Sequence, residues 1–427
     1  MNNPANSSSG FNQKTLPEKH RWLEKHTKLT QQDLNYLSQA DTHTSYTITS
    51  SLIENVVGTF HLPIGIIPYI NINQQVYTVP LAVEESSIVA ACNKMSKDID
   101  KRGGQITASH TGSSILGQVV INELSSEQYQ QLSNCLTANM NSWIDTLHTG
   151  LLRQMKQRGG GLHRWHLKSY LTDCQHHTAS LFVELNTVDA MGANLVTQTC
   201  EWLARSIESQ LNQSTLLSIV CNYSESALVE AVCRYPIDRS LGHRISQASQ
   251  FATLDIHRAT THNKGIMNAI DGLMVATGND WRAVSASMHA YACRTGQYQP
   301  LSQWHYRDNH LEGRLVAPIQ VGTVGGVTRI HPDAQLCLKL LNQPSSQDLA
   351  IIAGSIGLVQ NLAALSALVD GGLIAGHMRL HIDNMLLAHG VAHETQARLR
   401  PILIEHIKTH QSIQPSDITH YLNQLDL

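Results

Sequence analysis

The sequence predicts a multidomain protein of mixed α+β and α/β type, in which a large, mostly helical domain is interrupted by a compact α/β unit. The chain has 427 residues, whereas one domain usually has about 150, so two to four structural units are expected. Hydrophobic residues make up 42% of the chain and charged residues 15%, the latter well below the ~25% of average soluble domains, so a large core is expected. Strand-like and helical runs alternate between about residues 110 and 221, which is the pattern of an α/β unit.

The N-terminal part predicts two short helices, a strand and a longer helix. The second short helix opens at Thr30, with an acidic residue three positions later in a capping-box pattern. The apolar run Val76–Val83 predicts a buried strand. Either Ser86 or Ser87 is then expected to cap a helix that continues to Lys101, where an Arg-Gly-Gly sequence ends it.

The inserted unit is predicted from runs of alternating type. Strands are expected over Val119–Ile121, Leu181–Leu185 and Leu216–Val220, and helices over Gln128–Gln157 and Leu195–Leu211. Because strands and helices follow one another over this stretch, they predict one compact unit inserted in the larger domain.

The rest of the chain is predicted to be mainly helical. Residues 254–341 indicate helices joined by glycine-rich turns, and residues 345–370 indicate one long apolar helix. The expected domain limits are 1–110 and 222–372 for the two parts of the large domain, 111–221 for the inserted unit and 373–427 for a polar, helical C-terminal domain.

The long apolar helix has two interpretations. Residues Leu349–Val369 carry no charge over 21 positions, which is long enough to span a bilayer. The run also contains Gly, Gln and Asn, and no basic cluster flanks it as a membrane span would favour. A buried helix of a large core is therefore the favoured interpretation, with a membrane or interaction segment as the alternative.

Charge and cysteine content narrow the class of protein. Thirty basic and thirty-three acidic residues give a net charge of −3, so binding of nucleic acid through bulk charge is not expected. The eight cysteines are scattered without a CxxC pair, which is typical of a reducing compartment. The first residues contain no apolar stretch of the kind found in signal peptides. We therefore expect a cytoplasmic protein.

Common motifs for nucleotide binding and hydrolysis are absent from the sequence. The chain contains no GxGxxG, no P-loop and no GxSxG. His377 and His381 have the i,i+4 spacing of zinc ligands, but Met378 stands where a metalloprotease has its general-base Glu. A His-dependent metallohydrolase therefore stays as the alternative function, and no metal is expected in the favoured one.

Four segments place an ionisable residue beside Gly, Asn or Ser in an apolar setting: Glu84-Glu85, Lys264, Asp280 and Asp189. Each has an ordinary structural explanation when taken alone. Acidic residues are favoured at a helix N-terminus, an isolated Lys is usually solvated, an Asp often caps a helix, and a Gly turn often precedes one.

Together with neighbouring segments, however, they form an ordered set of motifs over roughly residues 50–385. The set is ENVVGTFHLPIG (54–65), VEESSIVAA (83–91), DAMGAN (189–194), RATTHNKGIMN (258–268), ATGNDWRA (276–283), VGTVGG (321–326) and GHMRLH (376–381). Their order and spacing resemble bacterial 3-hydroxy-3-methylglutaryl-CoA (HMG-CoA) reductase of the soluble, class II type. That resemblance implies a ferredoxin-like cofactor domain inserted in the substrate-binding domain, and a helical C-terminal flap.

The resemblance also implies four catalytic residues, Glu85, Lys264, Asp280 and His377. The expected reaction is the four-electron reduction of HMG-CoA by two nicotinamide hydrides, which gives mevalonate and CoA. Lys264 would stabilise the carbonyl oxyanion, and a protonated Glu85 would donate to the aldehyde oxygen. Asp280, hydrogen-bonded between the two, would raise the pKa of Glu85. His377, on the flap, would protonate the CoA thiolate.

Binding roles follow from the same resemblance. The substrate carboxylate and thioester are expected to contact Ser87, Arg258 and Asn268. The expected cofactor-binding residues are Asp189, Met191, Gly192, Asn194, Gly325, Gly326 and Arg153. Sites shared between two subunits imply a homodimer, and family members can assemble into larger oligomers.

One run of basic residues indicates which nicotinamide cofactor is preferred. Family members that use NADH carry an Asp shortly before a Gly-rich turn, whereas the corresponding run here contains Arg153, Lys156 and Arg158 and no acid. Basic side chains attract a 2′-phosphate and an acid repels it. NADPH is therefore favoured, with NADH as the other choice. The sequence leaves open whether mevalonate is made or degraded.

Overall fold

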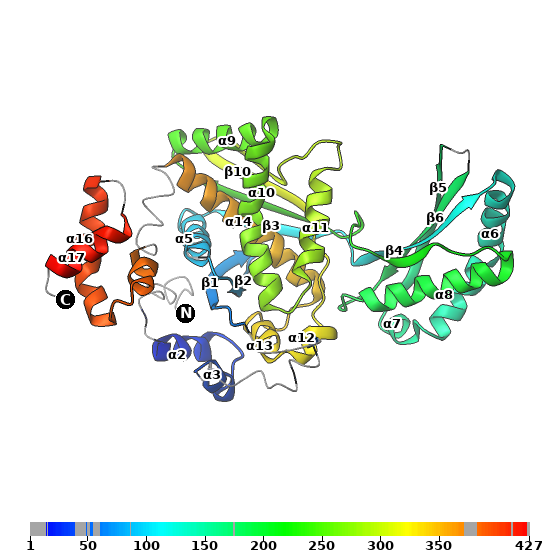
Figure 1. Cartoon of the computed structure of the whole chain (residues 1–427), viewed down its shortest axis with the longest axis horizontal. Coiled ribbons are helices and arrows are strands. Elements are labelled where there is room, and N and C mark those ends of the chain that lie inside the picture. Colours follow the sequence, from blue (N-terminus) through cyan, green and yellow to red (C-terminus); the bar gives the residue numbers. More distant parts are fainter. Residues whose placement is uncertain are drawn as a thin grey trace.

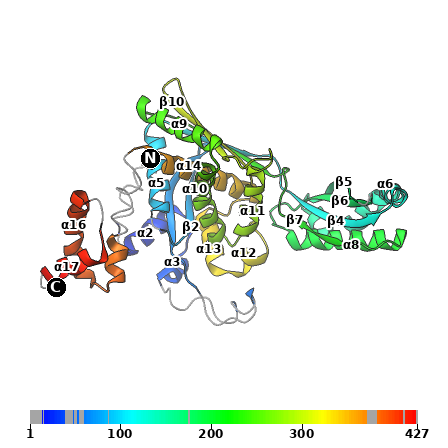
Figure 2. The same ribbon diagram turned by 45° about the horizontal axis from the view of Figure 1, so that its top comes forward.

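The computed structural model describes residues 14, 16–38, 48, 52–53, 60–85, 87–173, 176–370, 382–410 and 413–424. Figure 1 shows a central body, an α/β lobe on one side of it, and the C-terminal helices on the opposite side. The view in Figure 2 has the same order along the long axis. Each of the three parts has its own cluster of buried apolar side chains.

Two short helices, α2 (Leu16–His26) and α3 (Gln31–Ser38), lie near the start of the described chain. The predicted capping box is confirmed, because Asp33 accepts from Thr30 N at 2.8 Å and Asp33 N donates to Thr30 Oγ1 at 3.3 Å. Apolar residues of this pair pack against α13 (Pro332–Leu340). The two helices are thereby attached to the central body.

The predicted strand and the helix after it are also confirmed. β1 (Ile64–Ile72) pairs antiparallel with β2 (Gln75–Ala82), and α5 (Ile88–Lys101) follows. The expected serine cap takes a different form. Ser87 occupies the N-cap position with φ of 77°, and its side chain makes no capping hydrogen bond. The left-handed backbone turns the chain sharply between the end of β2 and α5.

A four-stranded antiparallel sheet forms one wall of the central core. Its order is β3 (Gln105–His110), β8 (Leu228–Pro236), β10 (His310–Pro318) and β9 (Ser302–Arg307). The prediction of helices alone over residues 254–341 is therefore wrong, because β9 and β10 form a hairpin there. Polar residues alternate with buried ones along both strands, which is the period of a half-buried strand.

The central body is built around two long helices. α10 (Ile256–Ala276) packs against α14 (Ser346–Val369), and both contact α9 (Arg239–Leu254). The other helices of this body are α11 (Trp281–Ala292), α12 (Gly326–Ile330) and α13. Among the described helices, α14 is long and apolar enough to cross a membrane, and 83% of its most apolar window is buried inside the protein. Burial against α10, β8 and α5 confirms the core interpretation.

The lobe drawn apart from the central body in Figure 1 is an antiparallel sheet with helices on one face. Its elements are β4 (Ser114–Leu124), α6 (Ser126–Thr149), α7 (Arg153–Gln157), β5 (Gly161–Leu171), β6 (His177–Asn186), α8 (Ala193–Leu211) and β7 (Leu217–Cys221). The strand order β5-β6-β4-β7, with a helix after its first and third strands, is that of a ferredoxin-like βαββαβ unit. The predicted helix over 128–157 is interrupted at Gly150, and β5 was not predicted.

The C-terminal part is helical. Residues 382–388, α16 (His393–His410) and α17 (Pro415–Gln424) surround a small apolar cluster of their own. Both Figure 1 and Figure 2 place it at the end of the molecule opposite the α/β lobe.

Candidate active site

An ion pair between Lys264 and Glu85 forms the centre of the candidate site. Lys264 Nζ donates to Glu85 Oε2 at 2.8 Å, with the two side chains 56% and 44% exposed. Lys264 projects from the middle of α10, and Glu85 lies in the turn from β2 to α5. The structure thus brings together two of the four predicted catalytic residues. Their pair is open to solvent, so a substrate can reach both groups.

The turn of α10 that carries Lys264 is held tightly from behind. His262 and Asn263 are 1% and 0% exposed, whereas Lys264 faces outward. Asn263 Nδ2 donates to the Gln299 carbonyl at 3.0 Å and Asn263 Oδ1 accepts from Leu301 N at 2.8 Å. The helix cannot shift along its axis without breaking these bonds, so the backbone that carries the Lys264 side chain is held in place.

The predicted substrate-binding residues lie near this pair in the chain, on the same two elements. Arg258 is in the first turn of α10, where its N–H donates to Asp255 Oδ2 at 2.7 Å. Its Nε is buried without a hydrogen-bond partner in the described part of the chain, and burial lowers the pKa of the guanidinium. Asn268 lies one turn after Lys264, and Ser87 lies two residues after Glu85. An anionic ligand would satisfy the Arg258 Nε.

Asp280 is not bonded to this pair within one chain. Its carboxylate caps α11, accepting from Ala283 N at 3.1 Å, and lies 3.4 Å from Arg282 Nη2. Lys264 is about 12 residues before the end of α10 at Ala276, a rise of ~18 Å. The predicted hydrogen bond of Asp280 between Lys264 and Glu85 is therefore wrong for a single chain.

A second set of predicted residues gathers where the α/β lobe joins the central body. The DAMGAN loop (189–194) lies against the VGTVGG segment (321–326): Thr323 N donates to the Asp189 carbonyl at 2.8 Å, and Ala190 forms a β-bridge with Val324. A Cβ added to Gly322 would lie 2.3 Å from Met191 N. The spacing of the two backbones therefore requires glycine at position 322.

Asn279 ties Asp280 to this junction. Asn279 Oδ1 accepts from Gly322 N at 2.8 Å, and the side chain is 8% exposed. Asp280 therefore belongs with the DAMGAN and VGTVGG segments and not with Lys264. The predicted residues fall into two groups, one around Lys264 in the middle of α10 and the other beyond its C-terminal end.

Glycines shape the surface of this junction. Gly192 has φ of 76° and precedes α8, and Gly325 and Gly326 have φ of 81° and 55° at the start of α12. Nothing lies within 4 Å of a Cβ built on Gly325 or Gly326. Asn194 is exposed in the first turn of α8, and Met191 is half-buried. The open space lies at Gly325 and Gly326. The N-terminus of α8, after Gly192, presents backbone N–H groups, which favour an anion.

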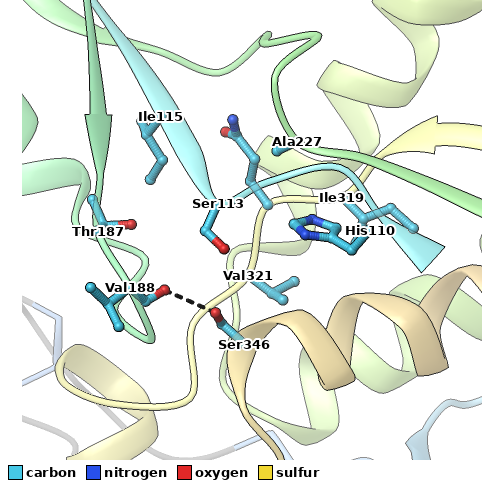
Figure 3. Close-up of a pocket in the computed structure, with 10 residues that line it drawn as sticks. His110, Ser113, Ile115, Thr187, Val188, Ala227, Ile319, Val321 and Ser346 are labelled. Carbon is cyan, nitrogen blue, oxygen red and sulfur yellow. Dashed lines mark hydrogen bonds between the residues drawn. The ribbon is translucent and has the colours of Figure 1, made fainter. Parts of the chain in front are cut away.

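The Asp189 carboxylate has a structural partner. Its Oδ1 accepts from Ser346 N at 2.9 Å, and Ser346 Oγ donates to the Val188 carbonyl at 2.9 Å. Figure 3 shows this second bond at the edge of a small cavity between the lobe and the central body. His110 and Ser113 also line that cavity, and burial lowers the pKa of His110. Asp189 thus joins the lobe to the N-terminus of α14.

The remaining predicted residues lie away from these two groups or outside the described residues. Arg153 is exposed as the first residue of α7 in the lobe. His377 and His381 lie outside the described residues, as do residues 54–59 of the first motif. Within the described ranges, no group of three His, Cys, Asp or Glu side chains is placed to hold a metal ion.

Two titratable residues near Lys264 were not singled out from the sequence. Burial, with a smaller effect of Arg258, lowers the pKa of His262 to about 4, and burial raises the pKa of Asp271 to about 6. His262 stands two positions before the lysine in the RATTHNKGIMN motif, which is the available sequence signal. Asp271 lies at i+7 from Lys264 on the same side of α10.

Known proteins resemble this chain over most of its length. Residues 15–382 match the profile of the hydroxymethylglutaryl-coenzyme A reductase family. A 3-hydroxy-3-methylglutaryl-coenzyme A reductase of Archaeoglobus fulgidus is 33% identical, with 84% of this chain and 82% of that protein covered. A probable enzyme of this name from Borreliella burgdorferi is 32% identical, covering 89% and 86%.

Solved structures give the same result. A class II 3-hydroxy-3-methylglutaryl-CoA reductase of Streptococcus pneumoniae, bound to NADPH in open conformations, has a TM-score of 0.79 and 35% identity, and covers 85% of this chain and 100% of its own. Another structure of the Streptococcus pneumoniae enzyme has a TM-score of 0.80 and 33% identity, with coverage of 98% and 99%. The ordered motifs, the Lys264–Glu85 pair and these similarities agree, and the chain belongs to the hydroxymethylglutaryl-coenzyme A reductase family, a family of NAD(P)H-dependent oxidoreductases, in its class II form.

Proposed function

We propose that this chain interconverts HMG-CoA with mevalonate and CoA through a site centred on Lys264 and Glu85. The observation that carries the proposal is their 2.8 Å ion pair, formed by residues of two motifs that are far apart in the sequence. A cation beside a carboxylate at a solvent-open position suits a carbonyl that gains negative charge and then a proton.

The pair can act on both carbonyls of the reaction. When bound, the nicotinamide cofactor supplies the hydrides. Lys264 Nζ donates to the thioester oxygen and stabilises its negative charge. Glu85, once protonated at Oε2, donates that proton to the aldehyde oxygen in the second reduction. Arg258 and Asn268 hold the substrate carboxylate and thioester end with Ser87. By family resemblance, His377 gives a proton to the departing CoA thiolate.

A dimer with shared sites is part of this proposal. Asp280 lies beyond the end of α10, and the part of α10 from Lys264 to that end is about 18 Å long. Asp280 is thus at the junction with the α/β lobe. A second copy related by two-fold symmetry can bring its Asp280 and its cofactor loop to the Lys264–Glu85 pair of the first. The separation of the two groups of residues within one chain supports this arrangement.

The α/β lobe is proposed as the cofactor domain. It corresponds to the inserted unit expected over residues 111–221, between the two parts of the substrate-binding domain and apart from the C-terminal flap. The open space beside Gly325 and Gly326 suits the dinucleotide backbone, with Met191, Gly192 and Asn194 forming the loop and Asp189 fixing it. Arg153, exposed on α7 with Lys156 and Arg158 nearby, favours the 2′-phosphate of NADPH. We further propose a cytoplasmic location.

The first experiment measures nicotinamide absorbance with HMG-CoA, in parallel with NADPH and NADH. Oxidation of two cofactor molecules per thioester is expected, and faster at low concentration with NADPH. A folded dimer that oxidises neither cofactor would disprove the activity. Equal or faster oxidation of NADH would contradict the role given to Arg153.

A pair of lysine variants tests the assigned site. Lys264→Ala should reduce kcat about a hundredfold to a thousandfold, because an oxyanion-stabilising group contributes roughly 2.7–4 kcal/mol to the transition state. Lys101→Ala, at an exposed position at the end of α5, is the control and should keep normal turnover. Turnover by Lys264→Ala close to that of the control would show that another group stabilises the oxyanion.

A further inference from the structure

Behind Lys264 lies a buried chain of hydrogen bonds that the proposed mechanism does not use. His262 Nε2 bonds Ser302 Oγ at 2.7 Å, and Ser302 Oγ bonds Asn361 Oδ1 at 2.9 Å. Asn361 Oδ1 also accepts from Trp304 Nε1 at 2.8 Å, and its Nδ2 donates to the His262 carbonyl at 3.1 Å. All four side chains are at most 1% exposed. The chain joins α10, β9 and α14.

The indole of Trp304 fixes the direction of every bond in this group. An indole N–H only donates, so the atom of Asn361 facing it must be the carbonyl oxygen. That oxygen only accepts, so the single hydroxyl proton of Ser302 is directed to it. Ser302 must then accept from His262, which therefore carries its proton on Nε2. The neutral Nε2–H tautomer of His262 is the form that completes the group.

The opposite ring nitrogen explains why His262 stays neutral. Nδ1 is buried and has no hydrogen-bond partner within the described ranges, so a proton added there would be a desolvated, unpaired charge. The pKa of His262 is lowered to about 4. Burial is the larger cause, and the positive charge of Arg258 on the preceding turn is the smaller one.

The groups joined to this imidazole by hydrogen bonds are uncharged. β9 presents Ser302 and Trp304, and α14 presents Asn361. On the segment before β9, Tyr298 lies near Asn263 and bonds His289 Nδ1 at 2.8 Å. Burial raises the pKa of Tyr298, so the phenol is neutral.

We propose that His262, acting through Ser302 and Asn361, is a positioning residue for Lys264 and serves in this way only as the neutral Nε2–H imidazole. The inference rests on the proposed function, because it takes Lys264 as the oxyanion-binding group. Lys264 sits two positions after His262 and immediately before Gly265, whose added Cβ would lie 3.6 Å from the Cβ of Ala364 on α14. The bonds to Ser302 and Asn361 therefore fix the height and rotation of the turn that aims the ammonium.

The kinetic test removes one bond at a time in the full-length protein. Ser302→Ala leaves His262 without its acceptor, and should lower kcat about tenfold to a hundredfold, the effect of misplacing a catalytic group by about 1 Å. KM for HMG-CoA should change less than about twofold, because the binding residues are untouched. Ser355→Ala is the matched control: it removes a fully buried serine hydroxyl of α14 that has no partner in the described part of the chain.

The two histidine variants separate positioning from packing. His262→Ala should lose kcat as Ser302→Ala does, and His262→Gln should recover most of it, because the Gln amide can donate to Ser302. Rates are compared at temperatures where each variant is folded by circular dichroism. Wild-type turnover in folded Ser302→Ala, or a fall in kcat no larger than in Ser355→Ala, would overturn the proposal. An inactive wild-type protein would instead reject the proposed function.

The protonation state is tested by acid unfolding, which needs no activity. The unfolded chain takes up a proton at His262 near the ordinary pKa of 6.5 and the folded chain only near 4. Stability from this group is complete above pH 6.5 and is lost as the pH falls toward 4. His262→Gln should therefore lose less stability than wild type between those values. Parallel pH profiles for the two proteins would contradict the neutral, buried imidazole.

Discussion

Lys264 and Glu85 are separated by 179 positions in the sequence and by 2.8 Å in the structure. Both side chains are about half exposed, and an ion pair in that setting contributes little to stability because water screens it. The pair is therefore better explained by chemistry than by folding. The buried residues behind Lys264 have the opposite character: they bind no ligand, and they fix the helix turn from which the ammonium projects.

Asp271 is a second residue, besides His262, for which we expect a direct effect of pH on stability. It lies on the same side of α10 as Lys264, its Oδ1 is buried without a partner in the described chain, and burial raises its pKa to about 6. A raised carboxyl pKa means that the folded state binds the proton more tightly than the unfolded state. Its contribution is therefore most favourable below pH 3.8 and is lost as the pH rises toward 6.

Asp271→Asn should remove the free-energy cost of ionising this buried carboxyl group. Because the residue is only partly buried, we expect a gain of only about 1–2 kcal/mol in the free energy of unfolding at pH 8. The gain should shrink toward zero near pH 4, where Asp271 is protonated in the folded protein. Urea unfolding at both pH values measures the difference. A gain of equal size at pH 4 and pH 8 would show that ionisation of Asp271 is not its cause.

At the scale of elements, α14 is held at its first turn by two sets of bonds. Ser345 Oγ accepts from Asp348 N at 3.1 Å, and Ser345 N donates to Asp348 Oδ2 at 3.3 Å, which is a local capping box. Asp189 of the DAMGAN loop adds an acceptor for Ser346 N at 2.9 Å. The main core helix and the candidate cofactor loop are therefore connected at one point.

Asp189→Ala should weaken both the attachment of α14 and the binding of NADPH by the candidate cofactor loop. The loss of one N-terminal acceptor should lower the free energy of unfolding by about 1 kcal/mol, and the loosened loop should raise KM for NADPH. Asp189→Asn keeps an oxygen acceptor and should preserve most of both properties. Ser345→Ala is the control, with a similar loss of stability of about 1 kcal/mol and an unchanged KM. If Asp189→Asn raises KM as much as Asp189→Ala, the carboxylate contacts the cofactor directly.

At the scale of the whole molecule, the predicted catalytic residues lie in two places. One chain places Glu85 with Lys264 in the middle of α10, and places Asp280 beyond the C-terminal end of that helix, beside the α/β lobe. The position of Asp280 is fixed by its neighbour Asn279, whose Oδ1 accepts a hydrogen bond from Gly322 N at 2.8 Å. In the proposed dimer, a second chain would complete a site that holds all three residues.

Mixing two inactive variants tests this arrangement. Lys264→Ala and Asp280→Ala should each be inactive as homodimers. After the chains are exchanged, half of the dimers contain one of each, and each mixed dimer has one intact site. About one quarter of wild-type activity should return, as expected for two-fold symmetric sites that each draw on both chains. A mixture without activity, in which mixed dimers are confirmed by mass spectrometry, would place Asp280 and Lys264 of the same chain in one site.

The elements best predicted from the sequence are those whose signals are local. The capping box at Thr30, the buried strand near Val79 and the apolar helix over 346–369 all follow from a few consecutive residues. The hairpin over 302–318 and strand β5 were missed. Their alternation is carried by Trp, His, Tyr, Leu and Arg, residue types that also occur in helices, so pairing with a neighbouring strand decides the outcome.

The candidate active site also depends partly on local sequence signals and partly on tertiary contacts. The sequence by itself determined the family, through motifs kept in order, and it determined which residue types are available for the chemistry. The tertiary structure alone decided that Lys264 meets Glu85, that Asn279, beside Asp280, is bonded to Gly322, and that His262 is buried and bonded from behind. These facts depend on contacts between residues far apart in the sequence and on burial, which sets the pKa of a side chain through its surroundings and not through its neighbours in the chain.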